Sequence, residues 1–551
     1  MSIYSQAKDV IVSLTKSALD KAFPGFPEYD FSVEVPKDSS FGDFSTNAAM
    51  MGARVLRKAP AVIAGAVSED FGSHRWIESV SVVGGFINFK MSRAFYADVV
   101  SSVLSEKENF GRSSFGKGKR YLVEFVSANP TGPMHIGNAR GGALGDSLAS
   151  VLDFAGFKVD REFYVNDAGN QIEKFGLSLD LRYQQLYRSG VEMPEDSYHG
   201  EDIIEHAKNF AEKYGDVYLD KPENERRTAL VKYALPINVR NLEKDLEGYR
   251  IKYDRWYFES DLHKSGAVKK IIDLLKSGGH TYEQDGALWF RATDFGCDKD
   301  FVLVRSNSIP TYIVPDIAYH YDKLVTRGYD KAINVLGADH HGYIARMKAA
   351  LKAIDIDPDK LDIVLMQMVN LIRDGQVVKA SKRSGKAITL VTLLDEIPID
   401  AARFFFNLRE PDSHFDFDLD LAVSRNNQNP VYYVQYAHAR ICSILEMLQK
   451  EGIDINSPFD AVLCEKPEVE LVKKLAVFPE EIIRSAIDYD VSRMTKYSVE
   501  LASVFHSFYN DCRVKCEDTG KMYARIALVR AVKQTLENVL GLLKVTAPEK
   551  M

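Results

Sequence analysis

Residues 121–149, YLVEFVSANPTGPMHIGNARGGALGDSLA, contain the pattern that decides the fold. They begin with an apolar, β-branched run, 121–126, which predicts a strand buried on both faces. The segment 127–133 holds Asn-Pro and Thr-Gly-Pro, so the chain must leave the strand through a tight, non-helical connection. From Ile136 onward, glycines and small apolar residues predict a closely packed helix. A helix N-terminus, whose free N–H groups and dipole suit a phosphate, is therefore expected at the carboxyl edge of a sheet.

His135 lies at the mouth of this turn, where its ring can donate a hydrogen bond to an oxyanion. Glycine-rich turns between a strand and a helix are common in doubly wound domains, so His135 can equally be a capping or core histidine. The turn matches neither the dinucleotide pattern GxGxxG nor the phosphate-loop pattern GxxxxGK[ST]. Those two kinds of nucleotide site are therefore disfavoured.

The segment 135–138, His-Ile-Gly-Asn, resembles the HIGH signature of class I aminoacyl-tRNA synthetases. Asn138 stands where the signature usually has histidine; it can donate a hydrogen bond but cannot carry a positive charge. The surrounding residues are similar to those of the arginyl-tRNA synthetases: Glu124, Ser127, Asn129-Pro130 and Gly132-Pro133. The resemblance implies ligation of arginine to its tRNA, driven by ATP.

Length and composition are typical of a soluble globular protein of three or four domains. The chain has 551 residues, of which 46% are hydrophobic and 27% charged, and its net charge of −8 excludes a wholly basic nucleic-acid coat but not a local basic surface. No apolar run can span a bilayer, and the five cysteines fit a reducing compartment. We expect a cytoplasmic protein without a membrane segment. Cys512 and Cys516, with His506 upstream, lack the spacing of a structural zinc site, so no metal is expected.

Residues 1–115 predict a small α+β domain. An apolar stripe at helical spacing occupies 10–22, and the segments 80–83 and 86–89 predict a hairpin around Gly84-Gly85. From the residues alone this can be a generic appendage. Gly42-Asp43-Phe44, Ala48 and residues 85–88 resemble the N-terminal domain of the arginyl-tRNA synthetases, which implies contact with the tRNA elbow. The segment 111–120 is a plausible linker.

Residues 116–395 predict a Rossmann-type α/β domain with a parallel sheet, which would be the catalytic domain. Residues 159–165 would be the second strand, parallel to the first, and the acidic stretch near 185–250 predicts a helical insertion outside the sheet. Further strands are expected at 288–290, 301–305 and 333–336. The last of these runs into Gly337, which allows a sharp turn at a strand's carboxyl end, where ligands bind in such sheets.

Asp316 follows Pro315 and is expected to head a helix. As an N-cap it would need no further role, and the residues alone favour that interpretation. The alternative pairs Asp316 with Glu124, because two carboxylates facing one pocket suit the bidentate donors of a guanidinium. The resemblance implies a larger arginine-binding set: Glu124, Ser127, Asn129, His135, Tyr312, Asp316, Asp339 and His340.

The segment 379–385, KASKRSG, resembles the mobile KMSKS loop of the same class, with Ala380 in the methionine position. A cationic loop of this kind can stabilise the negative charge that develops on a triphosphate. The catalytic residues that the resemblance implies are His135, Asn138, Lys379, Ser381 and Lys382. The ATP site, with Mg²⁺ in the substrate complex, would comprise His135, Gly137, Asn138, Gly337, Met368, Val369, Lys379 and Lys382.

Residues 396–551 predict an all-α helical bundle, with three apolar stripes that would form its core. The segment 429–440 resembles the start of an anticodon-binding domain, and tyrosines beside arginines suit stacking on splayed bases. A run of tyrosines at a domain boundary can also be packing. The expected tRNA contacts are Tyr433, Gln435, Tyr436 and Arg440. Cations expected on the outer surfaces of the bundle are Arg440, Arg493, Lys496, Arg525, Arg530 and Lys533.

The function expected from the sequence is an arginine–tRNA ligase, acting as a monomer on L-arginine, ATP and the tRNA for arginine. Three alternatives remain open. A class I ligase for another amino acid would not need Asp316, and a non-catalytic RNA-binding relative would explain Asn138 and Ala380. A small-molecule adenylyltransferase would leave the helical C-terminal domain without a role.

Overall fold

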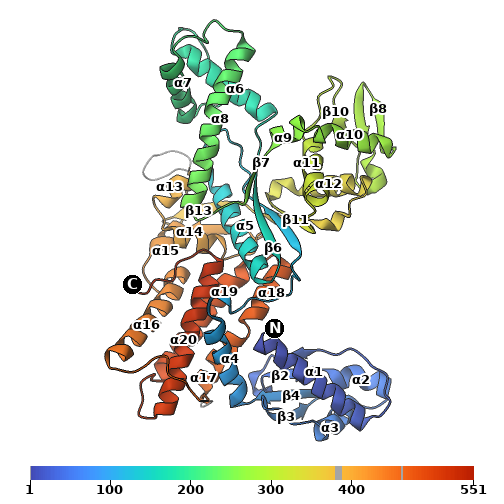
Figure 1. Cartoon of the computed structure of the whole chain (residues 1–551), viewed down its shortest axis with the longest axis vertical. Coiled ribbons are helices and arrows are strands. Elements are labelled where there is room, and N and C mark those ends of the chain that lie inside the picture. The colour runs from blue at the N-terminus through green and yellow to red at the C-terminus, as the bar shows by residue number, and fades with distance from the viewer. Residues whose placement is uncertain (1, 379–387, 461–462) are drawn as a thin grey trace. The chain divides into compact units, whose positions relative to one another are not determined.

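The computed structural model describes residues 2–378, 388–460 and 463–551. The chain folds as two compact units (Figure 1). One unit comprises Met1–Phe115, Arg425–Asp488 and Arg493–Met551, and the other Gly116–Ser424 and Tyr489–Ser492.

The Gly116–Ser424 unit is built around a five-stranded, wholly parallel sheet, which confirms the expected fold class. The strand order is β12-β11-β5-β6-β7, so the chain runs outward from β5 in one direction and from β11 in the other. The gap between these two strands is the topological switch point, where open α/β sheets bind ligands at their carboxyl ends. The strands are β5 (Arg120–Glu124), β6 (Lys158–Val165), β7 (Arg255–Phe258), β11 (Lys331–Gly337) and β12 (Leu361–Met366).

Helix α5 (Ile136–Phe154) follows β5 and is almost wholly buried, as the sequence predicts. Small residues allow it to approach the sheet closely: a Cβ at Gly145 would lie 2.2 Å from the ring of Phe125. The strand ends at Glu124, two residues earlier than expected, because Val126 and Ser127 adopt positive φ angles of 69° and 40°. The chain therefore turns sharply immediately after β5.

The connection from β6 to β7 contains three helices that pack on one another (Figure 1). Their own small core includes Phe175, Tyr183, Phe210 and Leu230. The helices are α6 (Asn170–Gln185), α7 (Glu201–Tyr214) and α8 (Glu223–Gly248).

The connection from β7 to β11 contains a separate antiparallel sheet, of order β10-β9-β8, so the two strands expected near 288 and 301 lie outside the parallel sheet. A π-helical turn, Asp322–Thr326, then leads into β11. The elements are α9 (Glu259–Lys264), α10 (Ala267–Ser277), β8 (Thr281–Gln284), β9 (Ala287–Phe290), β10 (Phe301–Val304) and α11 (Ile313–Tyr321).

The same unit ends in α12, a three-stranded sheet of order β14-β13-β15, and three short helices. These elements are α12 (His341–Ala353), β13 (Val369–Arg373), β14 (Gln376–Val377), α13 (Leu390–Leu394), α14 (Ile399–Phe406), β15 (Phe415–Asp418) and α15 (Leu419–Val423).

The N-terminal part of the other unit is α+β, as expected. Its antiparallel sheet has the order β1-β2-β4-β3, and the predicted hairpin is present, with Val83 opposite Phe86. The elements are α1 (Ile3–Ala22), β1 (Val33–Glu34), β2 (Phe44–Thr46), α2 (Ala48–Leu56), α3 (Pro60–Glu69), β3 (Ile77–Val83), β4 (Phe86–Met91) and α4 (Arg93–Glu106).

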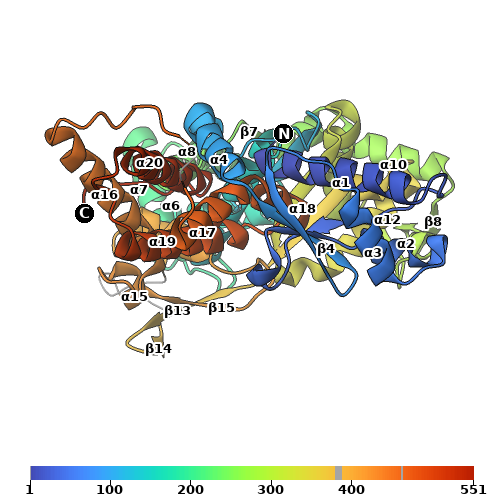
Figure 2. The same cartoon turned by 90° about the horizontal axis from the view of Figure 1, so that it is seen from below.

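Helix α4 packs against α17 and α20 of the C-terminal helices, so the helical layer is built from both ends of the chain (Figure 2). Asn538 of α20 donates hydrogen bonds to the carbonyl groups of Lys107 and Phe110 just beyond α4. The three predicted stripes form the core of this layer, which confirms the all-α region. Its helices are α16 (Pro430–Lys450), α17 (Lys466–Ala476), α18 (Phe478–Asp488), α19 (Ser492–Asp511) and α20 (Thr519–Leu542).

Candidate active site

The turn between β5 and α5 is fixed by Ser127 at the switch point of the parallel sheet. Its hydroxyl donates to Oε1 of Glu124 (3.0 Å) and accepts from the backbone N–H of Tyr164 on β6 (3.1 Å). Positive φ angles in non-glycine residues store strain, and such strain gathers at functional sites. The turn is thus held by side-chain contacts that cross from β5 to its neighbour.

His135 occupies the N-cap position of α5 and is exposed, so the core interpretation of this residue is wrong. Asn138 accepts a hydrogen bond from the backbone N–H of His135 through Oδ1 (3.0 Å). This closes the first turn of the helix, where the remaining N–H groups and the helix dipole favour an anion. Gly137 lies beside Met368: a Cβ there would be 4.0 Å from the methionine's Cε.

A hollow of about 530 Å³ opens in front of this helix N-terminus. It brings together four predicted site residues, Ser127, Asn129, His135 and Asn138. The opposite wall comes from the start of α7 and was not predicted: Tyr198, Gly200, Asp202 and Ile203.

The helices α7 and α8 also brace the loop that forms this hollow. Asn238 of α8 donates to the carbonyl of Pro130 (2.9 Å), and its amide oxygen contacts His206 of α7 (2.7 Å). Burial raises the pKa of the Asp202 carboxyl above its usual value. The sequence carried no signal for these contacts, because they join segments that lie far apart along the chain.

Glu124 ends β5 with its carboxylate buried beneath the turn. It pairs with Lys323, whose ammonium lies 2.5 Å from Oε2, and the two side chains are 8% and 0% exposed. This lysine was not predicted from the sequence. A carboxylate buried this deeply requires a cation or hydrogen-bond donors, and it has both.

Asp316 lies inside α11 at the fourth helical position, and Tyr312 is the N-cap, so the N-cap interpretation of Asp316 is wrong. Pro315 explains the error, because proline is tolerated in a first turn whose N–H groups have no helical partner. Burial, followed by the negative charges of Glu124 and Glu259, raises the pKa of Asp316 to about 7. The charge of Glu124 thus acts on Asp316, and the pairing of the two carboxylates around a guanidinium stays a prediction.

The remaining arginine-site candidates are more open to solvent. Tyr312 is 67% exposed and lies 3.5 Å from Arg346 through its hydroxyl. Gly337 ends β11, and the side chains of Asp339 and His340 just after it are 83% and 51% exposed. Gly337, Asp339 and His340 lie at the carboxyl edge of the sheet, across the switch point from β5.

Met368 and Val369 follow β12 at the same edge, and Val369 is buried as the first residue of β13. Arg140 of α5 anchors this segment, because its fully buried guanidinium donates to the carbonyl of Gln367 (2.6 Å) and to that of Glu410 (3.1 Å). Burial lowers the pKa of Arg140 to about 10. The predicted loop residues Lys379, Ser381 and Lys382 lie outside the described residues.

The tRNA-contact candidates lie on α16 and differ in exposure. Tyr436 is 39% exposed, whereas Gln435 donates to the carbonyl of Thr546 (2.9 Å). The guanidinium of Arg440 lies 4.3 Å from the ring of Tyr509, and Tyr433 packs on His506. The tyrosines therefore combine packing with partial exposure.

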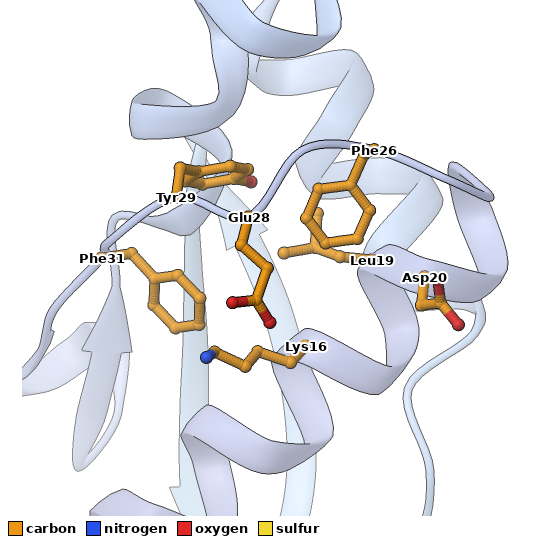
Figure 3. A pocket seen from close by; sticks show the side chains of 7 residues that line it. All are labelled: Lys16, Leu19, Asp20, Phe26, Glu28, Tyr29 and Phe31. Carbon is orange, nitrogen blue, oxygen red and sulfur yellow. The ribbon is translucent and has the colours of Figure 1, made fainter.

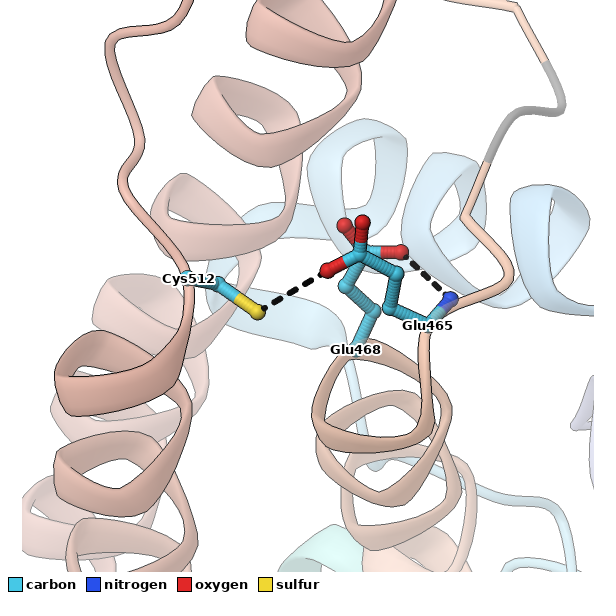
Figure 4. Close-up of side chains that lie close together, drawn as sticks. All are labelled: Glu465, Glu468 and Cys512. Carbon is cyan, nitrogen blue, oxygen red and sulfur yellow. Dashed lines mark hydrogen bonds between the residues drawn. The ribbon is translucent and has the colours of Figure 1, made fainter.

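Arg525 is buried in the helical layer, so its predicted place on the outer surface is wrong. Its guanidinium binds Glu465 and Glu468 at 2.8 Å each. These two carboxylates and the thiol of Cys512 form a cluster whose ligand atoms lie within 4.8 Å of one another (Figure 4). Because Arg525 and Lys521 already neutralise the carboxylates, the cluster is explained as a charge network within the protein.

The α+β region carries two hollows of its own. One, of about 230 Å³, lies between α1 and the segment after it, with Lys16 and Glu28 pointing toward the same space (Figure 3). The other, of about 510 Å³, is bordered by exposed apolar side chains that include Phe41, Met50 and Phe86.

Known proteins match the whole of this arrangement. A family model described as the tRNA synthetases class I (R) catalytic domain matches residues 99–419. A DALR anticodon binding domain matches 434–551, and an arginyl tRNA synthetase N-terminal domain matches 9–91. The parallel sheet and its switch-point turn are thus those of a class I aminoacyl-tRNA synthetase.

Relatives and solved structures narrow the class to one family. The arginine–tRNA ligase of Acetivibrio thermocellus is 52% identical over 100% of this chain and 99% of its own, and that of Caldanaerobacter subterraneus subsp. tengcongensis is 53% identical over 99% and 98%. The Thermus thermophilus arginyl-tRNA synthetase has the same fold, with a TM-score of 0.77 at 24% identity over 99% of this chain and 100% of its own. The chain belongs to the arginyl-tRNA synthetase family. No helix among the described residues is long and apolar enough to cross a membrane.

Proposed function

We propose that this protein joins L-arginine to the 3′ end of the tRNA for arginine and converts ATP to AMP and pyrophosphate. One observation carries the proposal. Glu124 is buried at the end of β5, beside the switch point of the parallel sheet, and its charge acts on the half-buried Asp316, in the unit whose α5 N-terminus favours an anion. A site that combines carboxylates for a cationic side chain with an anion site suits the activation of a basic amino acid by ATP.

Arginine would bind with its guanidinium between the two carboxylates. Each carboxylate can accept charge-assisted hydrogen bonds from the planar fork of donors, and Tyr312 would pack against the guanidinium face. A lysine ammonium entering the same site would leave acceptors unpaired, which disfavours it. Four side chains would hold the α-amino and carboxylate groups: Ser127, Asn129, Asp339 and His340.

In the first step, a carboxylate oxygen of arginine attacks the α-phosphorus of ATP, and the bond to the β-phosphate oxygen breaks. Arginyl-adenylate forms, and pyrophosphate leaves with Mg²⁺, which enters as part of the ATP complex. His135 and Asn138 would donate hydrogen bonds to the phosphates, so the protein contributes positioning and charge stabilisation rather than a covalent intermediate. The loop residues Lys379, Ser381 and Lys382 would neutralise the growing negative charge.

The adenosine of ATP would lie along the edge formed by the start of α5, the end of β11 and the segment after β12. Gly137 has no side chain, so the ribose and base can approach the α5 backbone, with Met368 close by. Gly337 would do the same at the end of β11, and Met368 and Val369 would border the base. In the second step, a terminal ribose hydroxyl of the tRNA attacks the activated carbonyl, and AMP leaves.

The tRNA would be held by three domains: 1–115 for its elbow, 116–395 for its 3′ end and 396–551 for its anticodon. The hollow bordered by Phe41, Met50 and Phe86 offers apolar faces on which an unpaired base can stack. On α16, Tyr433, Gln435, Tyr436 and Arg440 would face the anticodon loop. We further propose that the enzyme acts as a monomer in the cytoplasm.

The test is ATP–pyrophosphate exchange with arginine, with and without purified tRNA for arginine. Exchange that needs both arginine and tRNA is the expected result, and lysine should not replace arginine. Folded protein that gives no exchange with arginine under either condition overturns the proposal.

A further inference from the structure

A buried lysine stands beside the proposed arginine site. Lys323 belongs to the π-helical turn that follows α11, and its side chain is fully buried. Its ammonium lies 2.5 Å from Oε2 of Glu124, 3.1 Å from Oδ1 of Asn334 and 3.9 Å from the centre of the Tyr319 ring. A buried ammonium fixes the orientation of the groups around it, because its N–H donors can form hydrogen bonds only with protein atoms.

In the hydrogen bonds beyond Lys323, the donor and the acceptor of each bond can be assigned. Nδ1 of His320 lies 2.8 Å from the carbonyl oxygen of Asp316, and a carbonyl only accepts, so Nδ1 donates. Burial, with the charge of Lys323, lowers the pKa of His320 to about 3, so the ring is neutral and Nε2 accepts from the amide of Asn334 (3.0 Å). The amide oxygen of Asn334 therefore faces Lys323.

The path thus runs from the Glu124 carboxylate to the backbone carbonyl of Asp316. At one end is Glu124, held by the ammonium of Lys323, and at the other is the helical turn that carries Asp316. Each hydrogen bond fixes the orientation of the next group, so a displacement of Lys323 would change the positions of Glu124 and of the turn that carries Asp316.

The charges around the site indicate why a cation is needed. The negative charges of Glu124 and Glu259 raise the pKa of Asp316, and the positive charge of Lys323 opposes them. The neighbouring Arg327 is already engaged by Glu162, with which it makes a hydrogen bond of 2.8 Å. Without Lys323, the buried Glu124 carboxylate would lose the ammonium that pairs with it, and a buried carboxylate without its cation is strongly destabilising.

We infer that Lys323 is a positioning residue for arginine, whose ammonium holds the Glu124 carboxylate ready for the guanidinium. Through Asn334 and His320 it also holds the turn of Asp316, so the two carboxylates form one prearranged receptor. The inference rests on the proposed arginine site. Lys323 does not touch the reacting atoms and acts through Glu124.

The test is aminoacylation kinetics of Lys323→Met at saturating ATP and tRNA. We expect the KM for arginine to rise about tenfold or more, while kcat changes less than about threefold and the KM for ATP does not change. Lys331→Met is the matched control, because Lys331 makes an ion pair of the same length, 2.5 Å, with Asp362 in the same sheet. An arginine KM for Lys323→Met that rises no more than in this control overturns the inference.

The pH profile separates positioning from a merely structural role. In Lys323→Met, the charges of Glu124 and Glu259 still raise the pKa of Asp316, the opposing charge of Lys323 is gone, and Tyr343 still donates to Asp316. The KM for arginine should then begin to rise, as the pH falls, at a higher pH than in the wild-type protein. A profile that keeps the wild-type inflection contradicts the inference.

A double variant covers the case in which Lys323→Met does not fold. Lys323→Met combined with Glu124→Gln removes both buried charges together. Because Lys323 acts through Glu124, the double variant should show the arginine KM of Glu124→Gln alone. A further rise of about tenfold in the double variant overturns the inference, and an unchanged KM in Glu124→Gln alone overturns the proposed arginine site with it.

Discussion

Replacing Asp316 with asparagine is expected to stabilise the free protein while weakening its binding of arginine. Burial and the charges of Glu124 and Glu259 raise the pKa of Asp316 to about 7 from 3.8. A folded-state pKa of about 7, against an ordinary value of 3.8, means that keeping this group ionised costs about 4 kcal/mol of folding free energy. Part of the side chain still meets solvent, so we expect Asp316→Asn to gain about 2 kcal/mol at pH 8.

The stability that Asp316→Asn gains over the wild-type protein depends on pH. Because the pKa of Asp316 is higher in the folded state than in the unfolded state, the folded protein binds more protons between pH 4 and 7. The favourable effect of this group on wild-type stability is therefore complete below about pH 4 and is lost as the pH rises through 7. Asparagine does not titrate, so the advantage of the variant is largest above pH 7 and shrinks toward pH 4.

Thermal unfolding at pH 8 and pH 5, with arginine titration calorimetry at pH 8, measures both effects. We expect the midpoint of Asp316→Asn to rise by about 3 °C at pH 8 and by less at pH 5. Arginine affinity should fall about 10- to 100-fold, the value of a lost charged hydrogen bond. Asp359→Asn, at a carboxylate that is 89% exposed, serves as the control. A lower midpoint at pH 8, or an arginine affinity equal to that of the control, would contradict the burial cost and the binding role given to Asp316.

Three other substitutions test the phosphate site, the buried charge network of the helical layer and the apolar hollow of the α+β region. His135→Ala should lower kcat in pyrophosphate exchange about 100-fold, through the loss of a donor to the phosphates, and an unchanged kcat would contradict that role. Arg525→Met leaves Glu468 buried without its cation and should destabilise the protein by about 3–5 kcal/mol in thermal unfolding; the exposed Lys515→Met should have almost no effect. Phe86→Ala should raise the KM for tRNA about tenfold and leave the KM for arginine unchanged; an unchanged KM for tRNA argues against base stacking at this hollow.

The elements that the sequence predicted well depend on neighbours along the chain. The strand ending at Glu124, the turn and helix α5 follow from apolar periodicity, proline and glycine within about thirty residues. The same local signals predicted the hairpin around Gly84-Gly85 and the buried stripes of the C-terminal helices. These features are set by the backbone preferences and the apolar pattern of each segment.

The features that the sequence did not predict depend on partners far away along the chain. Lys323 pairs with a carboxylate 199 positions earlier, and a lysine in a helical turn is usually solvated. Arg525 was expected at the surface for the same reason, but Glu465 and Glu468 draw it inward. Asp202 belongs to an acidic stretch whose spacing gives no sign that one member reaches the hollow beside His135.

The most direct test of the account compares the binding of L-arginine with that of L-citrulline, its uncharged counterpart of nearly the same shape, by calorimetry at pH 8. If Glu124 and Asp316 recognise a guanidinium by its charge, citrulline should bind about 100-fold more weakly than arginine, and Glu124→Gln should narrow that difference. Equal affinities for the two ligands in the wild-type protein would contradict the claim that Glu124 and Asp316 select arginine by its charge.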